Sequence, residues 1–453
     1  MRRLAAIATV LWGAAACGQW QRVGSGPKPQ PGAGVPALFD ATAVYRAMGL
    51  VAAGPPLPFV ASLRYLGDAT PDSTLVLFGL SLTNHALSFQ RDRNEFVAQY
   101  RVEVDFRTDS ATVRRLASDQ TVRVRTFQET LRADESVIFQ EFVGVPPGSY
   151  RVSVVVRDRN AAGTARQESV DTVPRFTGRT LTAPIPVYEG TGRASPSALP
   201  KLLVNPRATL PYGADSLRFY VEGYGFKHGS RVAAWVTDQG GREAWRDTLT
   251  LAGGEALATA RIVLPPAELP VGRAELALHP VDGAPGDETH TPFLVSFSDQ
   301  WAITNFDEMI SLLRYFDRQD WVTKLRQASP ADRPSVWREF FKATDPVAIT
   351  PENEALDEYF KRIQVANQRF REGADLGWLT DRGEVFITLG EPDEIYDFST
   401  DIARTGARGF RWTYNSLRLT LFFIDQSGFG RFRLTPQSRA EFQRALARVR
   451  RSQ

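Results

Sequence analysis

The sequence predicts a mainly β protein with an α+β C-terminal part. We expect two immunoglobulin-like β-sandwich modules, then helices followed by a small antiparallel sheet. Before Trp301, apolar residues recur at every second position in short runs between Pro- and Gly-rich turns, which is typical of antiparallel strands with one buried face. After Trp301 they recur every three or four positions, which is typical of amphipathic helices. With 43% hydrophobic residues among 453, the chain can build several cores.

The N-terminus reads as a lipoprotein signal peptide over residues 1–17. A basic Met1-Arg2-Arg3 precedes the apolar run Leu4–Ala16. This run is shorter than the roughly 20 residues needed to span a bilayer, but it suits a signal peptide. Cys17 is the only cysteine and follows three alanines, so the site resembles a lipobox, in which the cysteine is lipidated after cleavage. An ordinary Ala-x-Ala signal with an incidental cysteine is the alternative.

Residues 18–57 are predicted to be a flexible tether followed by a short helix. The stretch Gly18–Pro36 is rich in Gly, Pro, Gln and Ser and has too little apolar content to order itself. Ala37–Leu50 can form the helix. Gly18, where Asp would signal inner-membrane retention, favours the outer membrane, with the body facing the periplasm or the surface. A single cysteine excludes structural disulfides within the chain.

The first predicted sandwich covers residues 58–190. Leu75–Leu82 is an apolar run, and two further segments alternate apolar with polar residues, as half-buried strands do. The turn Pro146–Ser149 leads into the second of them. The alternating apolar positions are Val102, Val104 and Phe106, and then Tyr150, Val152, Val154 and Val156.

The second predicted sandwich covers residues 199–298, after a Pro-, Gly- and Ser-rich stretch, Pro184–Pro200, that we interpret as a linker. Leu217, Phe219 and Val221 alternate with polar neighbours. A hairpin loop at Asp238–Gly241 joins two further strands, Val232–Val236 and Trp245–Leu251. The turn Leu269–Gly272 then opens a strand over Ala274–His279, and the module closes at Pro292–Phe297.

Residues 300–453 are predicted to be the α+β domain. Apolar residues at helical spacing mark a helix over Phe306–Phe316, a second that starts at Ser329-Pro330, and a third that starts at Thr350-Pro351. Strands are expected over Val385–Leu389, Phe410–Tyr414, Leu417–Ile424 and Phe429–Leu434. A basic helix beginning at Thr435-Pro436 ends the chain.

The densest group of turn-forming residues lies between the third helix and these strands. It starts with Gly377-Trp378-Leu379-Thr380-Asp381-Arg382-Gly383 and continues to Gly390-Glu391-Pro392-Asp393. Together with Asp345-Pro346, Ala366-Asn367 and Trp412-x-Tyr414, this pattern resembles the GWxTD domain family of bacterial envelope proteins. The resemblance implies β modules and a lipoprotein signal ahead of the domain. It carries over no functional residue, and it marks as structural Gly377, Trp378, Thr380, Asp381, Arg382, Gly383, Gly390, Pro392, Asp393, Trp412 and Tyr414.

Two side-chain groups in this segment have a chemical interpretation beside a structural one. Asp381, Glu384 and Asp393 contain the pair of carboxylates that a polysaccharide hydrolase needs, if two of them lie about 5–10 Å apart. Alternatively, Asp381 caps its own turn, Arg382 pairs with an acidic neighbour, and Asp393-Glu394 cap a following turn or helix. The aromatic residues Trp378, Trp412 and Tyr414 suit either a sugar-stacking surface or the core.

Several functional classes lack the residues they require. The four histidines all precede residue 300 and are not at metal-ligand spacing, and residues 300–453 contain neither histidine nor cysteine. Common zinc sites and nucleophilic triads are thereby excluded from this domain. The net charge of +3 and the lack of a basic patch with interleaved aromatics argue against nucleic acid. We expect no cofactor and no metal.

These observations favour a non-catalytic cell-envelope lipoprotein, an interaction or scaffold protein with a protein or glycan partner. The membrane is expected to hold it through lipid on Cys17. The alternative is a hydrolase that acts on polysaccharide through Asp381, Glu384 and Asp393.

Overall fold

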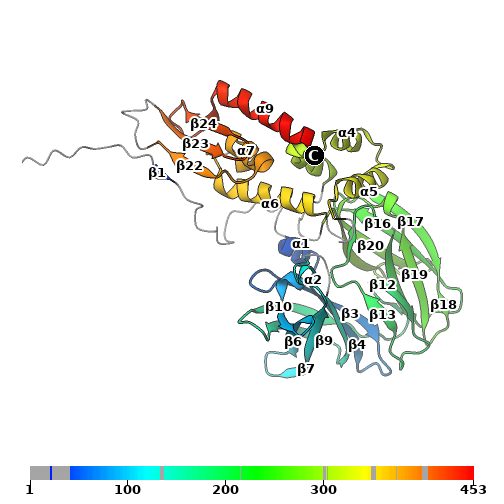
Figure 1. The fold of residues 1–453 in the computed structure, drawn as a ribbon. Helices are drawn as coiled ribbons and strands as arrows, with labels where there is room; N and C mark the ends of the chain where they lie inside the picture. The colour runs from blue at the N-terminus through cyan, green and yellow to red at the C-terminus, as the bar shows by residue number, and fades with distance from the viewer. Residues whose placement is uncertain are drawn as a thin grey trace, which may run out of the picture. The chain divides into compact units, whose positions relative to one another are not determined.

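The computed structural model describes residues 21–22, 41–132, 137–214, 216–298, 303, 305–347, 353–373, 375–399 and 407–452. The chain divides into two compact units. The N-terminal unit comprises residues 33–314 and 318–357, and the C-terminal unit comprises residues 315–317 and 358–453 together with the N-terminal residues 21–22. Figure 1 shows the course of the chain through both. Among the described residues, no helix is long and apolar enough to cross a bilayer.

The first β region of the N-terminal unit has two antiparallel sheets. Their strand orders are β2-β3-β4-β8 and β10-β9-β6-β5, and β7 pairs with β6. The strands are β2 Val51–Ala53, β3 Phe59–Gly67, β4 Thr74–Leu82, β5 Gln90–Asp92, β6 Glu95–Arg107, β7 Thr112–Val124, β8 Val137–Val145, β9 Gly148–Asp158 and β10 Thr164–Val173. The short helices of this region are α1 Ala41–Ala47, η2 Asn84–Ala86 and α2 Phe127–Thr130.

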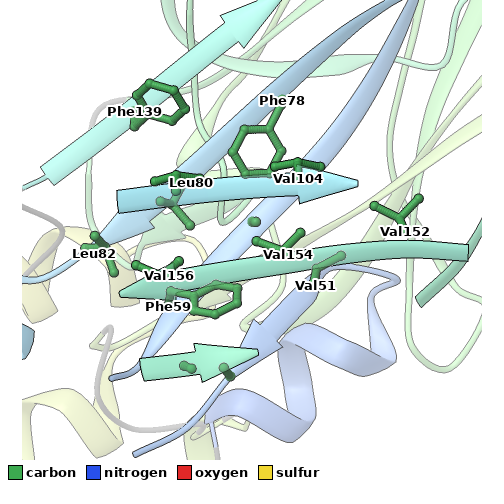
Figure 2. Packing of buried hydrophobic residues seen from close by; sticks show 14 of the residues in the cluster. Val51, Phe59, Phe78, Leu80, Leu82, Val104, Phe139, Val152, Val154 and Val156 are labelled. Carbon is green, nitrogen blue, oxygen red and sulfur yellow. The ribbon is translucent and has the colours of Figure 1, made fainter. Parts of the chain in front are cut away.

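The two sheets enclose one hydrophobic core. Figure 2 shows side chains of β4, such as Phe78 and Leu80, gathered with those of β6 and β9, such as Val104 and Val154. These side chains are completely buried. The alternation predicted for β6 is therefore confirmed. In β9 the predicted apolar positions are buried as well, but Ser153 between them is also buried.

The second β region also has two sheets, with orders β13-β12-β15-β19-β18 and β14-β21-β20-β16-β17, and β11 pairs with β15. Only the β14–β21 pair is parallel among the described strands. The strands are β11 Thr180–Leu181, β12 Ile185–Gly192, β13 Lys201–Val204, β14 Thr209–Pro211, β15 Leu217–Tyr224, β16 Arg231–Asp238, β17 Glu243–Thr250, β18 Ala252–Gly253, β19 Ala258–Leu264, β20 Gly272–Pro280 and β21 Thr289–Ser296, with a short helix η3 Pro266–Glu268.

The interpretation of Pro184–Pro200 as a linker is wrong for its first half. Ile185–Gly192 forms β12, which pairs with both β13 and β15. Its apolar residues pack against Leu66, Leu75 and Leu77 of the first β region. The pattern of Pro and Gly misled the interpretation, because β12 has irregular register at these residues and still belongs to a sheet.

The same contact buries the face of β15 that the alternation predicted to be polar and exposed. Glu222 lies there with no accessible surface and pairs with Arg193 at 2.8 Å. Tyr220 and Tyr224 donate their hydroxyl protons to Glu222, and Arg193 donates to the carbonyl of Gly67 on β3. A buried ion pair needs such extra hydrogen bonds to offset its lost hydration, and here they connect the two β regions.

A helical segment follows the second β region. Its elements are α3 Phe306–Leu312, η4 Leu313–Tyr315, α4 Gln319–Gln327, α5 Arg333–Thr344 and α6 Glu354–Arg369. Within the N-terminal unit, α3 and α5 pack on the β region through Tyr212, Phe297, Phe306 and Trp337, whose ring centroids lie 4.7–6.5 Å apart.

Two of the predicted helix starts can be compared with this segment. The helix expected from Ser329-Pro330 begins later, at Arg333, because Ser329 instead closes a turn with Asp332. The start expected at Thr350-Pro351 lies outside the described residues. The helix that follows it is present as α6.

The C-terminal unit contains a sheet of order β1-β22-β23-β24-β25. Its elements are β1 Gln21–Arg22, η5 Gly377–Leu379, α7 Asp381–Leu389, β22 Glu394–Asp397, β23 Arg408–Tyr414, β24 Leu419–Asp425, β25 Arg433–Leu434 and α9 Pro436–Ser452. Figure 1 shows α9, in red, lying along β24. The mainly β fold with a C-terminal α+β part is thus as predicted.

Three details of the predicted C-terminal unit are wrong. Val385–Leu389 is part of the helix α7 and not a strand, because Thr380 caps a helix there. The last strand is confined to Arg433–Leu434, since Gly428 and Gly430 adopt positive φ just before it. Gln21–Arg22 pairs with β22, so these two residues of the expected tether form an edge strand.

Candidate functional site

Two glycines of the Gly377–Gly383 segment are required by close backbone packing. A Cβ on Gly377 would lie 2.1 Å from the carbonyl oxygen of Ala366 on α6. A Cβ on Gly383 would lie 2.0 Å from the carbonyl oxygen of Gly377. Since real Cβ contacts are never this short, only glycine lets α6, η5 and the first turn of α7 stack directly on one another.

Thr380 and Trp378 fix the start of α7. The Thr380 hydroxyl donates to the carbonyl of Gly377 at 2.8 Å and accepts from the amide of Gly383 at 3.1 Å, which makes Thr380 the N-cap of the helix. Trp378 is buried, its ring meets Tyr315 edge-on, and its amide donates to Asn367 of α6. Capping residues of this kind typically contribute about 1 kcal/mol to a helix.

The structural interpretation predicted that Asp381 caps its own turn, and this is wrong. Asp381 instead links α7 to β25 and α9 near the end of the chain. Its carboxylate accepts from the amide of Leu434 on β25 at 2.8 Å and pairs with Arg439 of α9 at 2.8 Å. Glu384, one helical turn later, pairs with the same Arg439 at 2.6 Å. Burial alone would lower the pKa of Arg439, but the two carboxylates outweigh it and raise that pKa.

Arg382 pairs with an acidic residue, as predicted, but the partner is Glu372 and the pair is buried. Its guanidinium lies 3.1 Å from Glu372, whose side chain has no accessible surface. The rings of Phe370, Phe410 and Phe432 surround it, with centroids 4.5–5.6 Å from Cζ. Burial raises the pKa of Glu372, and the charge of Arg382 opposes this rise. The pair is thus held where both charges are poorly hydrated.

The second turn of the pattern closes α7 and leads into the sheet. Gly390 ends the helix with a φ of 82°, a conformation that favours glycine. Its carbonyl accepts from the buried hydroxyl of Tyr414 at 3.0 Å. Pro392 is buried, and Asp393 accepts from the amide of Asn415 at 2.7 Å, which joins the turn to the end of β23.

The structure brings two of the three candidate carboxylates together and leaves the third apart. Asp381 and Glu384 share Arg439, whereas Asp393 lies beyond the other end of α7, whose nine residues span roughly 13 Å. The sheet gives a similar separation. Asp381 bonds a residue paired with Phe423, and Asp393 bonds the residue after Tyr414, which pairs with Leu419.

The three aromatic candidates belong to the core. Trp378, Trp412 and Tyr414 are each less than a tenth exposed. Trp412 packs between Phe370 and Phe423, with centroids 5.3 and 4.7 Å away. None of the three offers an open ring face on which a sugar could stack.

Sequence reasoning missed the partners that make this segment a network. The sequence does not indicate that Glu372 and Arg439 are partners of the signature, by which we mean the residues Gly377–Asp393. Both contact it only in the folded chain. Cys17, the predicted lipidation site, lies outside the described residues. Within the residues that are described, no cluster of His, Cys, Asp and Glu is placed to hold a metal ion.

We predict that Gly383→Ala destabilises the C-terminal unit by about 1–3 kcal/mol, as overpacking does. In an unconstrained helix the same change would stabilise by up to about 1 kcal/mol, so the sign distinguishes the two. Thermal melting with hydrogen exchange at α7 measures it. Gly254→Ala is the matched control, because a Cβ there meets nothing within 4 Å. Faster exchange is expected only for Gly383→Ala, and unchanged exchange would contradict the packing constraint.

We also predict that Glu372→Ala costs about 3–5 kcal/mol, because it leaves Arg382 charged, buried and unpaired. Glu391→Ala serves as control. Glu391 also pairs with an arginine, Arg369, but at a partly exposed position, where such pairs contribute less than about 1 kcal/mol. Urea denaturation followed by tryptophan fluorescence compares the two. Equal urea midpoints for both variants would contradict the prediction, because the buried pair would then contribute no more to stability than the partly exposed one.

One of three comparisons with known proteins identifies a family domain in this chain. A search of curated proteins finds no match. Among solved structures, the BSP domain of a biofilm-associated protein aligns at 9% identity over 55% of this chain and 54% of that chain, with a TM-score of 0.16. This chain therefore spans about half the length of that structure. The family description "GWxTD domain" matches residues 284–424. These residues include the stacked glycines, the Thr380 cap and the Arg382–Glu372 pair, so the chain contains a GWxTD domain.

Proposed function

We propose that the protein is a non-catalytic lipoprotein of the bacterial cell envelope that acts as an interaction or scaffold protein. The supporting observation is that the polar side chains of the signature are engaged in the fold. Thr380 caps α7, Asp381 binds the amide of Leu434, and Arg382 pairs with Glu372. A catalytic group needs its reacting atoms free to meet a substrate, and these atoms are occupied by the protein itself.

The hydrolase alternative has weaker support. Two carboxylates of a glycosidase flank the bond to be cleaved at about 5–10 Å from each other. Asp381 and Asp393 are separated by the length of α7, roughly 13 Å for its nine residues. Asp381 and Glu384 are near neighbours, but both carboxylates pair with the same Arg439. In the third pair, Glu384 binds Arg439 and Asp393 binds the amide of Asn415, so no pair is free to flank a substrate.

The proposed localisation is the outer membrane, where lipid on Cys17 would anchor the protein. It rests on the sequence alone, namely the basic start, the short apolar run, and a single cysteine after three alanines. One acyl chain anchors a protein only marginally, whereas two or three hold it stably. The proposed partner is a protein or glycan of the envelope.

We predict that Asp381→Asn rescues the phenotype of a gene deletion as well as the unchanged protein does. The amide oxygen can still accept from Leu434, and we expect a stability loss of about 1 kcal/mol, typical of one weakened hydrogen bond. Asp381→Ala leaves a buried amide unpaired and should lose about 1–3 kcal/mol. Complementation and thermal melting are measured together, with the partly exposed Glu441→Gln as control. Loss of rescue by Asn at an unchanged melting temperature would indicate catalysis and defeat the proposal.

We predict that Cys17→Ser moves the protein from the membrane fraction to the soluble fraction, because the hydroxyl of Ser cannot replace the thiol as the lipidation site. Fractionation of the envelope followed by immunodetection measures the shift. The control is Ser25→Ala in the expected tether, which should leave the protein with the membranes. If Cys17→Ser stays with the membranes, the anchor lies elsewhere.

A further inference from the structure

A pocket of about 580 Å³ opens in the N-terminal unit. Its walls are the β16–β17 hairpin loop, the turn from η3 to β20, and the first residues of α3 and α5. The volume lies within the roughly 300–1,000 Å³ of small-ligand sites. Part of the wall comes from residues that match the GWxTD family and part from the β region before them, so the site depends on both.

Some charged residues of the pocket are already engaged in the fold. Asp238 accepts from the amides of Gly240 and Arg242 and also pairs with the Arg242 side chain at 3.2 Å. Glu243 pairs with Arg246. These interactions shape the hairpin loop.

Three other charged residues of the lining form no ion pair among the described residues. Arg333 makes no ion pair there; its guanidinium lies 4.1 Å above the ring of Phe306, and its Nε is buried without a hydrogen-bond partner. The carboxylates of Glu268 and Asp307 accept no hydrogen bond and form no ion pair within the described part of the chain. The pocket therefore offers one strong donor and two strong acceptors.

This combination selects the chemistry of the ligand. A polyanion would be attracted by Arg333 but repelled by the two carboxylates. A cation would be attracted by the carboxylates but repelled by Arg333. A hydroxyl both donates and accepts, so a neutral ligand with many hydroxyls can satisfy all three groups at once. The apolar surface of Leu269 and Pro270, which also line the pocket, suits the C–H face of a sugar ring.

We propose that this pocket binds a short neutral oligosaccharide of hexose or N-acetylhexosamine units. The inference rests on the proposed role as an envelope protein with a partner, and it names the class of that partner. Arg333 donates to ring or hydroxyl oxygens, and Glu268 and Asp307 accept from sugar hydroxyls. A peptide also presents donors and acceptors, but peptides commonly pair with a strand edge, whereas the three groups that would bind here lie on η3, α3 and α5.

The test uses the purified full-length protein and four trisaccharides: maltotriose, cellotriose, chitotriose and mannotriose. Saturation-transfer NMR detects binding, and titration gives the Kd. We expect at least one trisaccharide to bind, and we expect Arg333→Ala and Glu268→Gln each to weaken it by about tenfold or more, as the loss of a charged hydrogen bond does. Arg326→Ala on α4 and Glu255→Gln, exposed and outside the pocket, are the matched controls and should leave the Kd unchanged.

Three outcomes overturn the proposal: no transfer to any of the four trisaccharides, a Kd that neither pocket variant alters, or binding of a lysine-containing peptide in place of the sugars. Thermal melting of each variant separates lost binding from lost folding. If Arg333→Ala unfolds the unit, Glu268→Gln decides, since Glu268 is exposed and has no structural partner to lose. Membrane fractionation and rescue test the proposed function without these sugars, so the two proposals can fail separately.

Discussion

The contact of backbone on backbone at Gly377 and Gly383 is the constraint on which the rest of the C-terminal unit depends. With a Cβ at either position, atoms would lie about 2 Å from a carbonyl oxygen, and α7 would have to move away from α6. The position of α7 in turn directs its first-turn side chains. Asp381 then reaches β25 and α9, and Arg382 reaches Glu372 behind the rings. Close packing therefore comes first, and the polar network follows from it.

The polar network fixes the position of α7 more than it adds to the free energy of unfolding. A buried ion pair loses hydration that its attraction only partly restores, so it is weak evidence for stability by itself. It does make other positions of α7 unfavourable, because a shift of this helix would leave a charged group unpaired among Phe370, Phe410 and Phe432. Glu372 also accepts from the amide of Phe432, which ties the pair to the strand region of the sheet. The buried Arg193–Glu222 pair has a similar position between the two β regions.

Periodicity predicted those elements that have one buried face. Strands β6 and β9 and helix α9 show their period because their other faces meet water. It failed where an element is covered on several sides. Val385, Phe386 and Ile387 are all buried, so α7 appears in the sequence as a short apolar run of β-favouring residues. The partners Glu372 and Arg439 were not predictable either, because long-range pairs leave no trace in local spacing. The signature itself was recognisable because glycine, threonine and proline act on the nearby backbone.

A pattern whose members are used for packing identifies a fold, and a fold does not determine a function. Charged groups without an ion-pair partner in the fold therefore indicate function better than the most recognisable motif does. In the signature, each polar group that the alternative chemistry needs already has a partner within the protein. Around the pocket at α3 and α5, by contrast, Arg333, Glu268 and Asp307 form no ion pair within the described part of the chain, and Arg333 lies over the ring of Phe306. A charged group that is not paired within the fold is able to bind a ligand, whereas a group already paired in the fold is not. The physical asymmetry between these two regions is the reason to look for function at the pocket and for structure at the signature.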